Sequence, residues 1–242
     1  MDLGISGRRA AVAAGTSGLG LASAIALASE GVHVAICGRD EERLARAAEA
    51  VGHGCVPIVA DVSTHAGAEE FVAAAADALG AVDILVPNAG GPPPGTFAST
   101  PVDAYPAALD LNLMSVVAMC KAAVPGMQER RWGRVVAITS VSVRQPIANL
   151  ILSNTARAGA TAFLKTLALE VAGDGVTVNS VQPGLHRTPR VEQLYGGDQQ
   201  QSVRMGEASD FGQIVAFLCS EAAKFTTGAA LHVDGGSYLA LQ

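Results

Sequence analysis

Two serines stand where a predicted strand meets a predicted helix, a position from which hydroxyl groups can act on a bound substrate. Ser140 and Ser142 follow the apolar, β-branched run 134–139, which is typical of a buried strand. From about Leu150 apolar residues recur at helical spacing. Open α/β proteins place their chemistry where the end of a strand faces the first turns of a helix. This segment is therefore the first candidate for an active site.

A glycine-rich turn near the N-terminus has the composition of a phosphate-binding loop. Residues 13–20 read AAGTSGLG and stand between a short apolar strand and a helix. Glycines at such a turn let backbone N–H groups approach a phosphate, and the helix N-terminus adds partial positive charge. Similar turns also serve packing alone, so the position of this one, after the first strand of a long series, carries the nucleotide-binding interpretation.

The ends of the second and third predicted strands carry charged residues suited to the adenosine half of a dinucleotide. Arg39 could pair with a 2′-phosphate, and the neighbouring Asp40 with a ribose hydroxyl. Asp61, followed by Val62, could meet the adenine edge. This pattern favours NADP(H) over NAD(H). The alternatives are a solvated cation at Arg39 and a helix cap at Asp61.

Strand-like and helix-like segments alternate along the whole chain and must position these residues. The alternation predicts an α/β fold: a single Rossmann-like, doubly wound domain over residues 1–242, with a seven-stranded parallel sheet covered by helices on both faces. Asp40 and either Ser63 or Thr64 are expected helix caps. A long helix is expected over residues 105–128. The polar, irregular segment at residues 185–206 is predicted to be a substrate lid.

Composition limits the remaining function classes. The chain has 242 residues and a net charge of −6 without a basic run, which argues against nucleic acid as the main partner. The four cysteines are far apart in apolar segments, so we expect core thiols and no metal site. No N-terminal leader and no uninterrupted membrane-length span is evident, so we expect a cytoplasmic protein without a membrane. Only 16% of residues are charged, which suggests burial against other subunits or a large core with an alanine-rich coat.

Several short motifs, in their order and spacing, resemble the short-chain dehydrogenase/reductase family, in its 3-oxoacyl-carrier-protein-reductase-like branch. The resemblance covers nearly the whole chain and implies a Rossmann-like sheet of seven strands, a nicotinamide cofactor and usually a tetramer. The matching pieces are AAGTSGLG, Asp61-Val62, Asn88-Ala89-Gly90, Asn112, Ser140, Asn179 to Gly184 with Thr188, and Val233 to Gly236.

The resemblance also implies roles for individual residues. Asn112, Ser140, Ser153 and Arg157 occupy the positions of the family's catalytic residues. The implied cofactor-binding residues are Ala14, Gly15, Ser17, Gly18, Leu19, Gly20, Arg39, Asp61, Val62, Asn88, Ala89, Gly90, Arg157, Pro183, Gly184 and Thr188.

The sequence departs from the family pattern at five of its positions, one of which is Ala13 in place of the threonine of the family's turn. The family's tyrosine stands typically 13 positions after the serine and its lysine four further on, and these places hold Ser153 and Arg157. Serine is shorter than tyrosine and a much weaker acid, while arginine keeps the positive charge but does not release a proton near neutrality. Ala14 replaces a glycine of the family's turn, and Pro87 replaces an asparagine.

A proton donor other than tyrosine would have to come from a small set of residues. The candidates are Ser140, Ser142, a water chain ordered by Asn112, His186 and Tyr195, each of which has a structural role as its alternative.

Arg144, Arg187 and Arg190 could face the substrate opening near the proline-rich loop at residues 90–95. They would suit an anionic or carrier-bound substrate, or could simply be solvated cations.

Two function classes follow from these observations. The first is an NADP(H)-dependent oxidoreductase that transfers hydride between nicotinamide and a small-molecule carbonyl/alcohol substrate, with a non-standard proton donor. The second is a non-catalytic nucleotide-binding or partner subunit with the same fold. In either case a homotetramer or homodimer is expected.

Overall fold

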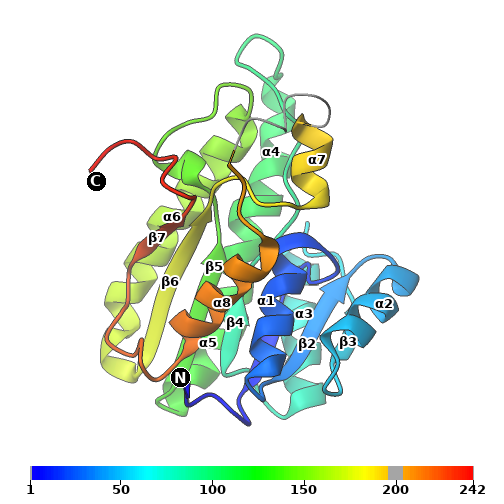
Figure 1. Cartoon of the computed structure of the whole chain (residues 1–242), viewed down its shortest axis with the longest axis vertical. Helices are drawn as coiled ribbons and strands as arrows, with labels where there is room; N and C mark the ends of the chain where they lie inside the picture. The colour runs from blue at the N-terminus through cyan, green and yellow to red at the C-terminus, as the bar shows by residue number, and fades with distance from the viewer. Residues whose placement is uncertain (1, 196–203, 242) are drawn as a thin grey trace.

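The computed structural model describes residues 2–195 and 204–241. It contains one parallel sheet of 7 strands in the order β3-β2-β1-β4-β5-β6-β7, with helices on both faces (Figure 1). The predicted Rossmann-like, doubly wound fold is therefore confirmed. The strands are β1 (Arg9–Val12), β2 (His33–Gly38), β3 (Val56–Val59), β4 (Ile84–Val86), β5 (Gly133–Ile138), β6 (Val176–Pro183) and β7 (Ala230–Val233).

Two layers of helices bury the sheet. One layer comprises α1 (Gly18–Ser29), α2 (Glu41–Val51) and α8 (Ala208–Cys219), whose apolar side chains form one core cluster. The other comprises α3 (His65–Leu79), α5 (Ser115–Glu129) and α6 (Ile151–Val171). Because both faces are covered, central strands such as β5 are buried along their whole length. The cysteines follow this pattern: Cys37, Cys120 and Cys219 are buried free thiols, and Cys55 is half-buried.

Two helices begin at capping residues that the sequence predicted. The Asp40 carboxylate accepts a hydrogen bond from the Arg43 backbone N–H and caps α2. Thr64, rather than Ser63, caps α3 by accepting from the Gly67 N–H. Both caps satisfy backbone donors that the first helical turn leaves without partners.

The predicted continuous helix over residues 105–128 is interrupted. A 3-10 turn η1 (Val102–Ala104) leads into α4 (Tyr105–Leu109), and the π-helical turn η2 (Asp110–Met114) separates α4 from α5. A π turn accommodates one extra residue, so apolar spacing on either side remains helical and does not reveal the break.

The same stretch has membrane length, although Asp110 and Lys121 interrupt its apolar residues, as the expectation of no uninterrupted apolar span requires. Val102–Glu129 contains an 18-residue window that is apolar enough to span a bilayer, by length and composition alone. Half of that window is buried inside the structure, where α5 packs between α3 and α6. A core helix of a globular fold meets the same length criterion.

Smaller differences occur at element ends. β4 begins at Ile84 rather than Val82, although the Asp83 backbone still pairs with Arg9 on one side and Arg134 on the other. The predicted lid contains a short helix, α7 (Pro189–Tyr195), and is therefore not irregular throughout. Part of the lid, residues 196–203, lies outside the described residues. The remaining short turns are η3 (Val141–Val143) and η4 (Ala172–Asp174).

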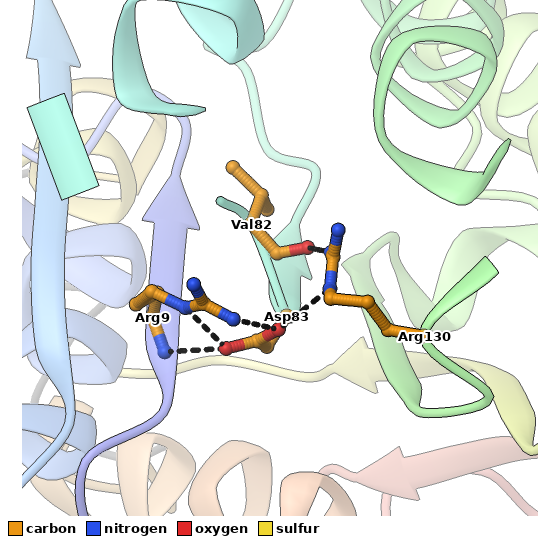
Figure 2. A network of polar contacts seen from close by, with 4 residues as sticks. All are labelled: Arg9, Val82, Asp83 and Arg130. Carbon is orange, nitrogen blue, oxygen red and sulfur yellow. Dashed lines mark hydrogen bonds and ion pairs between the residues drawn. The ribbon is translucent and has the colours of Figure 1, made fainter. Parts of the chain in front are cut away.

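Asp83 binds two arginines at the amino end of the sheet (Figure 2). Its carboxylate accepts from Arg9 Nε at 2.7 Å and Nη2 at 2.9 Å, and from Arg130 Nε at 3.3 Å. Arg130 also donates to the Val82 carbonyl. Burial alone would raise the pKa of Asp83, but the hydrogen bonds and positive charge of Arg9 outweigh it and lower the pKa below its ordinary value.

We predict that Asp83→Asn lowers the free energy of unfolding by about 3 kcal/mol at pH 7, because it leaves two arginines without their counter-charge. Because the pKa of Asp83 is lowered in the folded protein, its carboxylate stabilises the fold fully at pH values above the ordinary carboxyl pKa of about 4. This stabilisation is lost as the pH falls through the pKa of Asp83 in the folded protein. The difference between wild type and variant should therefore shrink in urea denaturation below pH 4, measured at one protein concentration.

Glu42→Gln is the matched control for this substitution. Glu42 forms an exposed ion pair with Arg46 on α2. Its removal should cost at most about 0.5 kcal/mol. An Asp83→Asn variant as stable as the Glu42→Gln variant at pH 7 would show that the network does not stabilise the sheet.

Candidate active site

The carboxyl ends of the strands open into a cleft of about 980 Å³. Strand order reverses between β1 and β4, so the loops that follow these two neighbours diverge and leave a crevice between them. The helix α7 lies above this end of the sheet (Figure 1). The walls come from the glycine turn, the segments that follow β2 to β6, the start of α6, and α7.

The glycine turn is shaped by close backbone contacts. A Cβ at Gly20 would lie 2.5 Å from the Ala14 carbonyl oxygen and 2.7 Å from Asn88 Nδ2, so no side chain fits there. Ala14 has a φ of 46°, the left-handed conformation that glycine adopts freely. The alanine methyl makes that conformation costlier by about 1–2 kcal/mol. The turn therefore retains its shape despite the alanine.

Asn88 joins the glycine turn to the end of β4. Its Nδ2 donates to the Ala13 carbonyl at 3.2 Å and to the Ala14 carbonyl at 3.4 Å. Asn88, Ala89 and Gly90 also line the cleft. The side chain thus holds the two loops that bound the crevice at a fixed separation.

The end of the cleft beside β2 and β3 is rich in charge. Arg39 is 74% exposed in its side chain and stands 3.9 Å from the Asp61 carboxylate. Burial alone would raise the pKa of Asp61. The hydrogen bonds from Ser63 and the positive charge of Arg39 together have a larger, opposite effect, so the pKa of Asp61 lies below its ordinary value. Asp40 is engaged in capping α2. Arg43 lines the same end and was not identified from the sequence.

Ser140 lines the cleft, and in the described part of the chain its hydroxyl group donates no hydrogen bond to the backbone. Its Oγ accepts from the Ser142 backbone N–H at 3.0 Å. A hydroxyl that accepts in this way can still donate its own proton. Ser142, by contrast, is buried, and its Oγ has no hydrogen-bond partner in the described part of the chain.

Ser153 and Arg157 lie one turn apart on α6, and both line the cleft. Arg157 Nη1 donates to the carbonyls of Ile138 at 3.0 Å and Thr139 at 3.3 Å, directly before Ser140. Burial lowers the pKa of Arg157 to about 10, and the positive charge of Arg190 adds to the effect. Arg157 therefore remains a cation at neutral pH.

Two predicted site residues do not line the cleft. Gly15 donates its N–H to the Cys37 carbonyl, and a Cβ there would lie 2.8 Å from an Ile36 side-chain carbon, so this glycine serves packing. Asn112 is buried in the π-helical turn, where its Nδ2 donates to the Gly90 carbonyl at 2.9 Å. Its Oδ1 has no hydrogen-bond partner among residues 2–195 and 204–241. Asn112 thus supports the Gly90 loop from behind.

The three arginines considered for the substrate opening do not lie together, so the interpretation in which all three face it is wrong. Arg187 forms an exposed ion pair with Glu207. Arg144 lines a separate cavity beside β7. Only Arg190, of these three, lines the main cleft. Sequence proximity to a lid does not fix the direction in which each side chain points.

The end of β6 and the predicted lid contribute several other lining residues. Pro183, Gly184 and Thr188 line the cleft, as does Tyr195. His186 is buried: its Nδ1 stands 3.2 Å from the Gly184 carbonyl, and its ring meets Phe211 edge-on. These contacts support the structural alternative for His186.

Fewer than half of the lining residues were identified as site residues from the sequence, and the others were missed. The located residues include Ser17, Gly18, Leu19 and Val62. The Asp40 cap could have pointed to Arg43, since capping fixes the first turn of α2, whereas the apolar lining residues carry no sequence signal. The missed residues are Thr16, Arg43, Ser63, Leu111, Thr139, Gln145, Ile147, Leu150, Leu194 and Tyr238, among others.

The family model described as enoyl-(acyl carrier protein) reductase matches residues 13–238. Dehydrogenase/reductase SDR family member 4 from Oryctolagus cuniculus is 33% identical, covering 96% of this chain and 94% of that protein. L-sorbose reductase from Gluconobacter frateurii, solved with NADPH and L-sorbose, superimposes with a TM-score of 0.92 at 33% identity, covering 100% of both chains. An NADPH-bound short-chain oxidoreductase from Pseudomonas aeruginosa with an atypical catalytic center gives a TM-score of 0.89 at 30% identity, covering 96% of this chain and 97% of that one. The chain belongs to the short-chain dehydrogenase/reductase family.

Proposed function

We propose that this protein is an NADP(H)-dependent oxidoreductase that transfers hydride between a nicotinamide and a carbonyl/alcohol carbon, with a proton source other than tyrosine. The observation that carries the proposal is a single cleft that joins a glycine turn at one end to Ser140, Ser153 and Arg157 at the other. Membership of an oxidoreductase family supports the same reaction class.

The residues of the cleft fit a dinucleotide with a 2′-phosphate. The glycine turn and the N-terminus of α1 would hold the pyrophosphate, since Ser17, Gly18 and Leu19 line the cleft there and a helix N-terminus attracts phosphate. Arg39 and Arg43 would hold the 2′-phosphate, with Asp61 and Val62 beside the adenine. The nicotinamide half would lie against Asn88, Ala89, Gly90, Arg157, Pro183, Gly184 and Thr188.

The nicotinamide would supply or accept the hydride when bound. Ser140 would orient the substrate carbonyl by donating its hydroxyl proton, because its oxygen already accepts from Ser142. Ser153 would stand one helical turn from Arg157 on the same wall. Neither serine is acidic enough to replace a tyrosine as the titrating group.

Arg157 would stabilise negative charge on the reacting oxygen without giving up a proton. Its pKa of about 10 keeps it charged at neutral pH, and its bonds to the Ile138 and Thr139 carbonyls fix it next to Ser140. A positioned cation of this kind lowers the energy of a developing alkoxide. The proton would then come from water in the cleft.

We also propose that the protein is a cytoplasmic homodimer or homotetramer. Leu169 on α6 is 73% exposed, and Leu231 on the edge strand β7 is 40% exposed. Apolar exposure on a helix and on a sheet edge suits burial against another copy. Light scattering that gives a monomer would count against an oligomer.

We predict that Arg39→Ala weakens NADPH binding at least tenfold while changing NADH binding less than twofold, because only NADPH carries the 2′-phosphate. Titration calorimetry is the suitable measurement. Trp132 lies at the opposite end of the sheet, before β5, where its Nε1 donates to Glu221, so its fluorescence is a poor probe of the cleft. Arg46→Ala, on an exposed turn of α2, is the control. Equal losses for both cofactors would reject the assignment of Arg39.

We predict that Ser153→Tyr combined with Arg157→Lys raises the rate of NADPH-dependent carbonyl reduction at least tenfold, because it restores a phenol with a cation one turn away. NADPH absorbance with a panel of ketones and 3-oxoacyl thioesters measures the rate. Ser153→Phe with Arg157→Lys fills the same space without a hydroxyl and should give no gain.

Two other results would change the interpretation. A robust wild-type rate that the Tyr/Lys pair abolishes would make Ser153 and Arg157 the working site in their own right. Failure of the wild type to bind either cofactor would favour a non-catalytic partner subunit, to which the departures at Ala14, Ser153 and Arg157 also point.

A further inference from the structure

Arg157 and Arg190 bring two positive charges into one cleft without a carboxylate partner. In the described part of the chain, neither guanidinium forms an ion pair. Arg157 donates to two backbone carbonyls, and Arg190 Nη2 donates to the Pro92 carbonyl at 2.7 Å. By contrast, the buried guanidinium of Arg134 has Glu221 as a counter-charge at 3.4 Å.

The two guanidinium groups are close enough to affect each other. The charge of Arg190 contributes, after burial, to the lowered pKa of Arg157. Like charges in a shared, partly buried site repel, and an anion between them would relieve that repulsion. The acidic residues of the described cleft lining are Asp40 and Asp61. Both follow β2 or β3, and both already have partners: the Arg43 N–H for Asp40, and Ser63 with Arg39 for Asp61.

Arg190 is held in place by the loop that follows β4. A Cβ added to Gly91 would lie 2.7 Å from Arg190 Nη2 and 2.9 Å from Nε, so the guanidinium lies against the bare backbone of this glycine. The bond to Pro92 fixes its orientation. The loop itself is anchored to the start of α6, because Gly95 donates to the Asn149 carbonyl and accepts from the Ile151 N–H. A cation fixed before the ligand arrives loses little entropy on binding.

The rest of this part of the cleft is largely apolar. Leu150 and Ser153 come from the start of α6, and Leu194 comes from the same helix as Arg190. Leu111 and Ile147 add to the apolar lining, and Gln145, Gln193 and Tyr195 are polar exceptions in the same segments. Such a wall accommodates a hydrocarbon body, while the two arginines accommodate a charged group.

We propose that Arg157 and Arg190 form a carboxylate-binding subsite and that the substrate is a 2-oxo acid, or the matching 2-hydroxy acid, with a small apolar body and with its carboxylate next to the oxygen that Arg157 stabilises. The inference rests on the proposed hydride-transfer function, and it adds the substrate class. Planar guanidinium groups recognise carboxylates by paired N–H donors. The same groups would also hold a phosphate, so the experiment must distinguish a substrate carboxylate from the cofactor's own phosphates.

The first test compares an acid with its ester. Wild type should reduce 4-methyl-2-oxopentanoate with a kcat/KM at least tenfold above that for its methyl ester. Arg190→Gln should lower this acid-to-ester ratio at least tenfold. Arg187→Gln, whose side chain pairs with Glu207 outside the cleft, should leave the ratio unchanged. Gly91→Ala should act in the same direction as Arg190→Gln, because a methyl group displaces the guanidinium.

The second test does not depend on turnover. Isovalerate, which has no carbonyl to reduce beyond its carboxylate, is titrated by calorimetry into the protein saturated with NADP⁺. Binding at least tenfold weaker in Arg190→Gln than in wild type, with NADPH affinity changed less than twofold, is the expected result.

The outcomes separate the two proposals. Isovalerate binding that depends on Arg190 in a protein without reductase activity would support the subsite and reject the proposed function. Reduction of ketones with no preference for the acid would reject the subsite and keep the function. A tenfold loss of NADPH affinity in Arg190→Gln would assign the arginine to a cofactor phosphate and reject the subsite.

Discussion

The carboxylate of Asp83 fixes the pairing of β1 with β4, and the cleft exists because these two strands are neighbours. Backbone and side chain both contribute: Arg9 N–H and its guanidinium donate to the carboxylate, and Asp83 N–H donates to the Arg9 carbonyl. β4 has only three residues, so its ladder alone offers few hydrogen bonds to hold it in the centre of the sheet. At the opposite end of the same two strands, Asn88 ties the loop after β4 to the turn after β1. One strand pair is thus held at both ends, by charge at one and by an amide at the other.

Side chains in and beside the cleft also hold the ends of strands β4 and β5 in place. Arg157 donates to the last carbonyls of β5, and Asn112 donates to the Gly90 carbonyl after β4. Both side chains therefore hold the carboxyl ends of adjacent strands in addition to any part they take in a reaction. A substitution at Arg157 would perturb the backbone before Ser140 as well as the charge in the cleft, so its kinetic effect needs a stability measurement beside it.

The sequence predicted the fold well because alternating strand and helix patterns, capping residues such as Asp40 and Thr64, and the glycine turn are all local signals. The interior of the site was less predictable. The π turn around Asn112 preserves helical spacing on both sides and left no mark in the periodicity. Gly15 and Gly20 look alike in the sequence, yet one packs on Ile36 and the other makes room beside Ala14. The directions of Arg144, Arg187 and Arg190 depend on tertiary contacts that spacing does not encode.

The contact between Arg190 and Gly91 affects which amino-acid substitutions this cleft can accept in evolution. Any side chain at residue 91 would collide with the guanidinium, whereas a shorter residue at 190 would remove that restriction. The two positions, far apart in the chain, are therefore coupled: a larger residue at 91 displaces the Arg190 guanidinium from its present place, and it has no such effect once Arg190 is lost. Among natural relatives, glycine at one position should accompany arginine at the other, as a record of which lineages kept this cation.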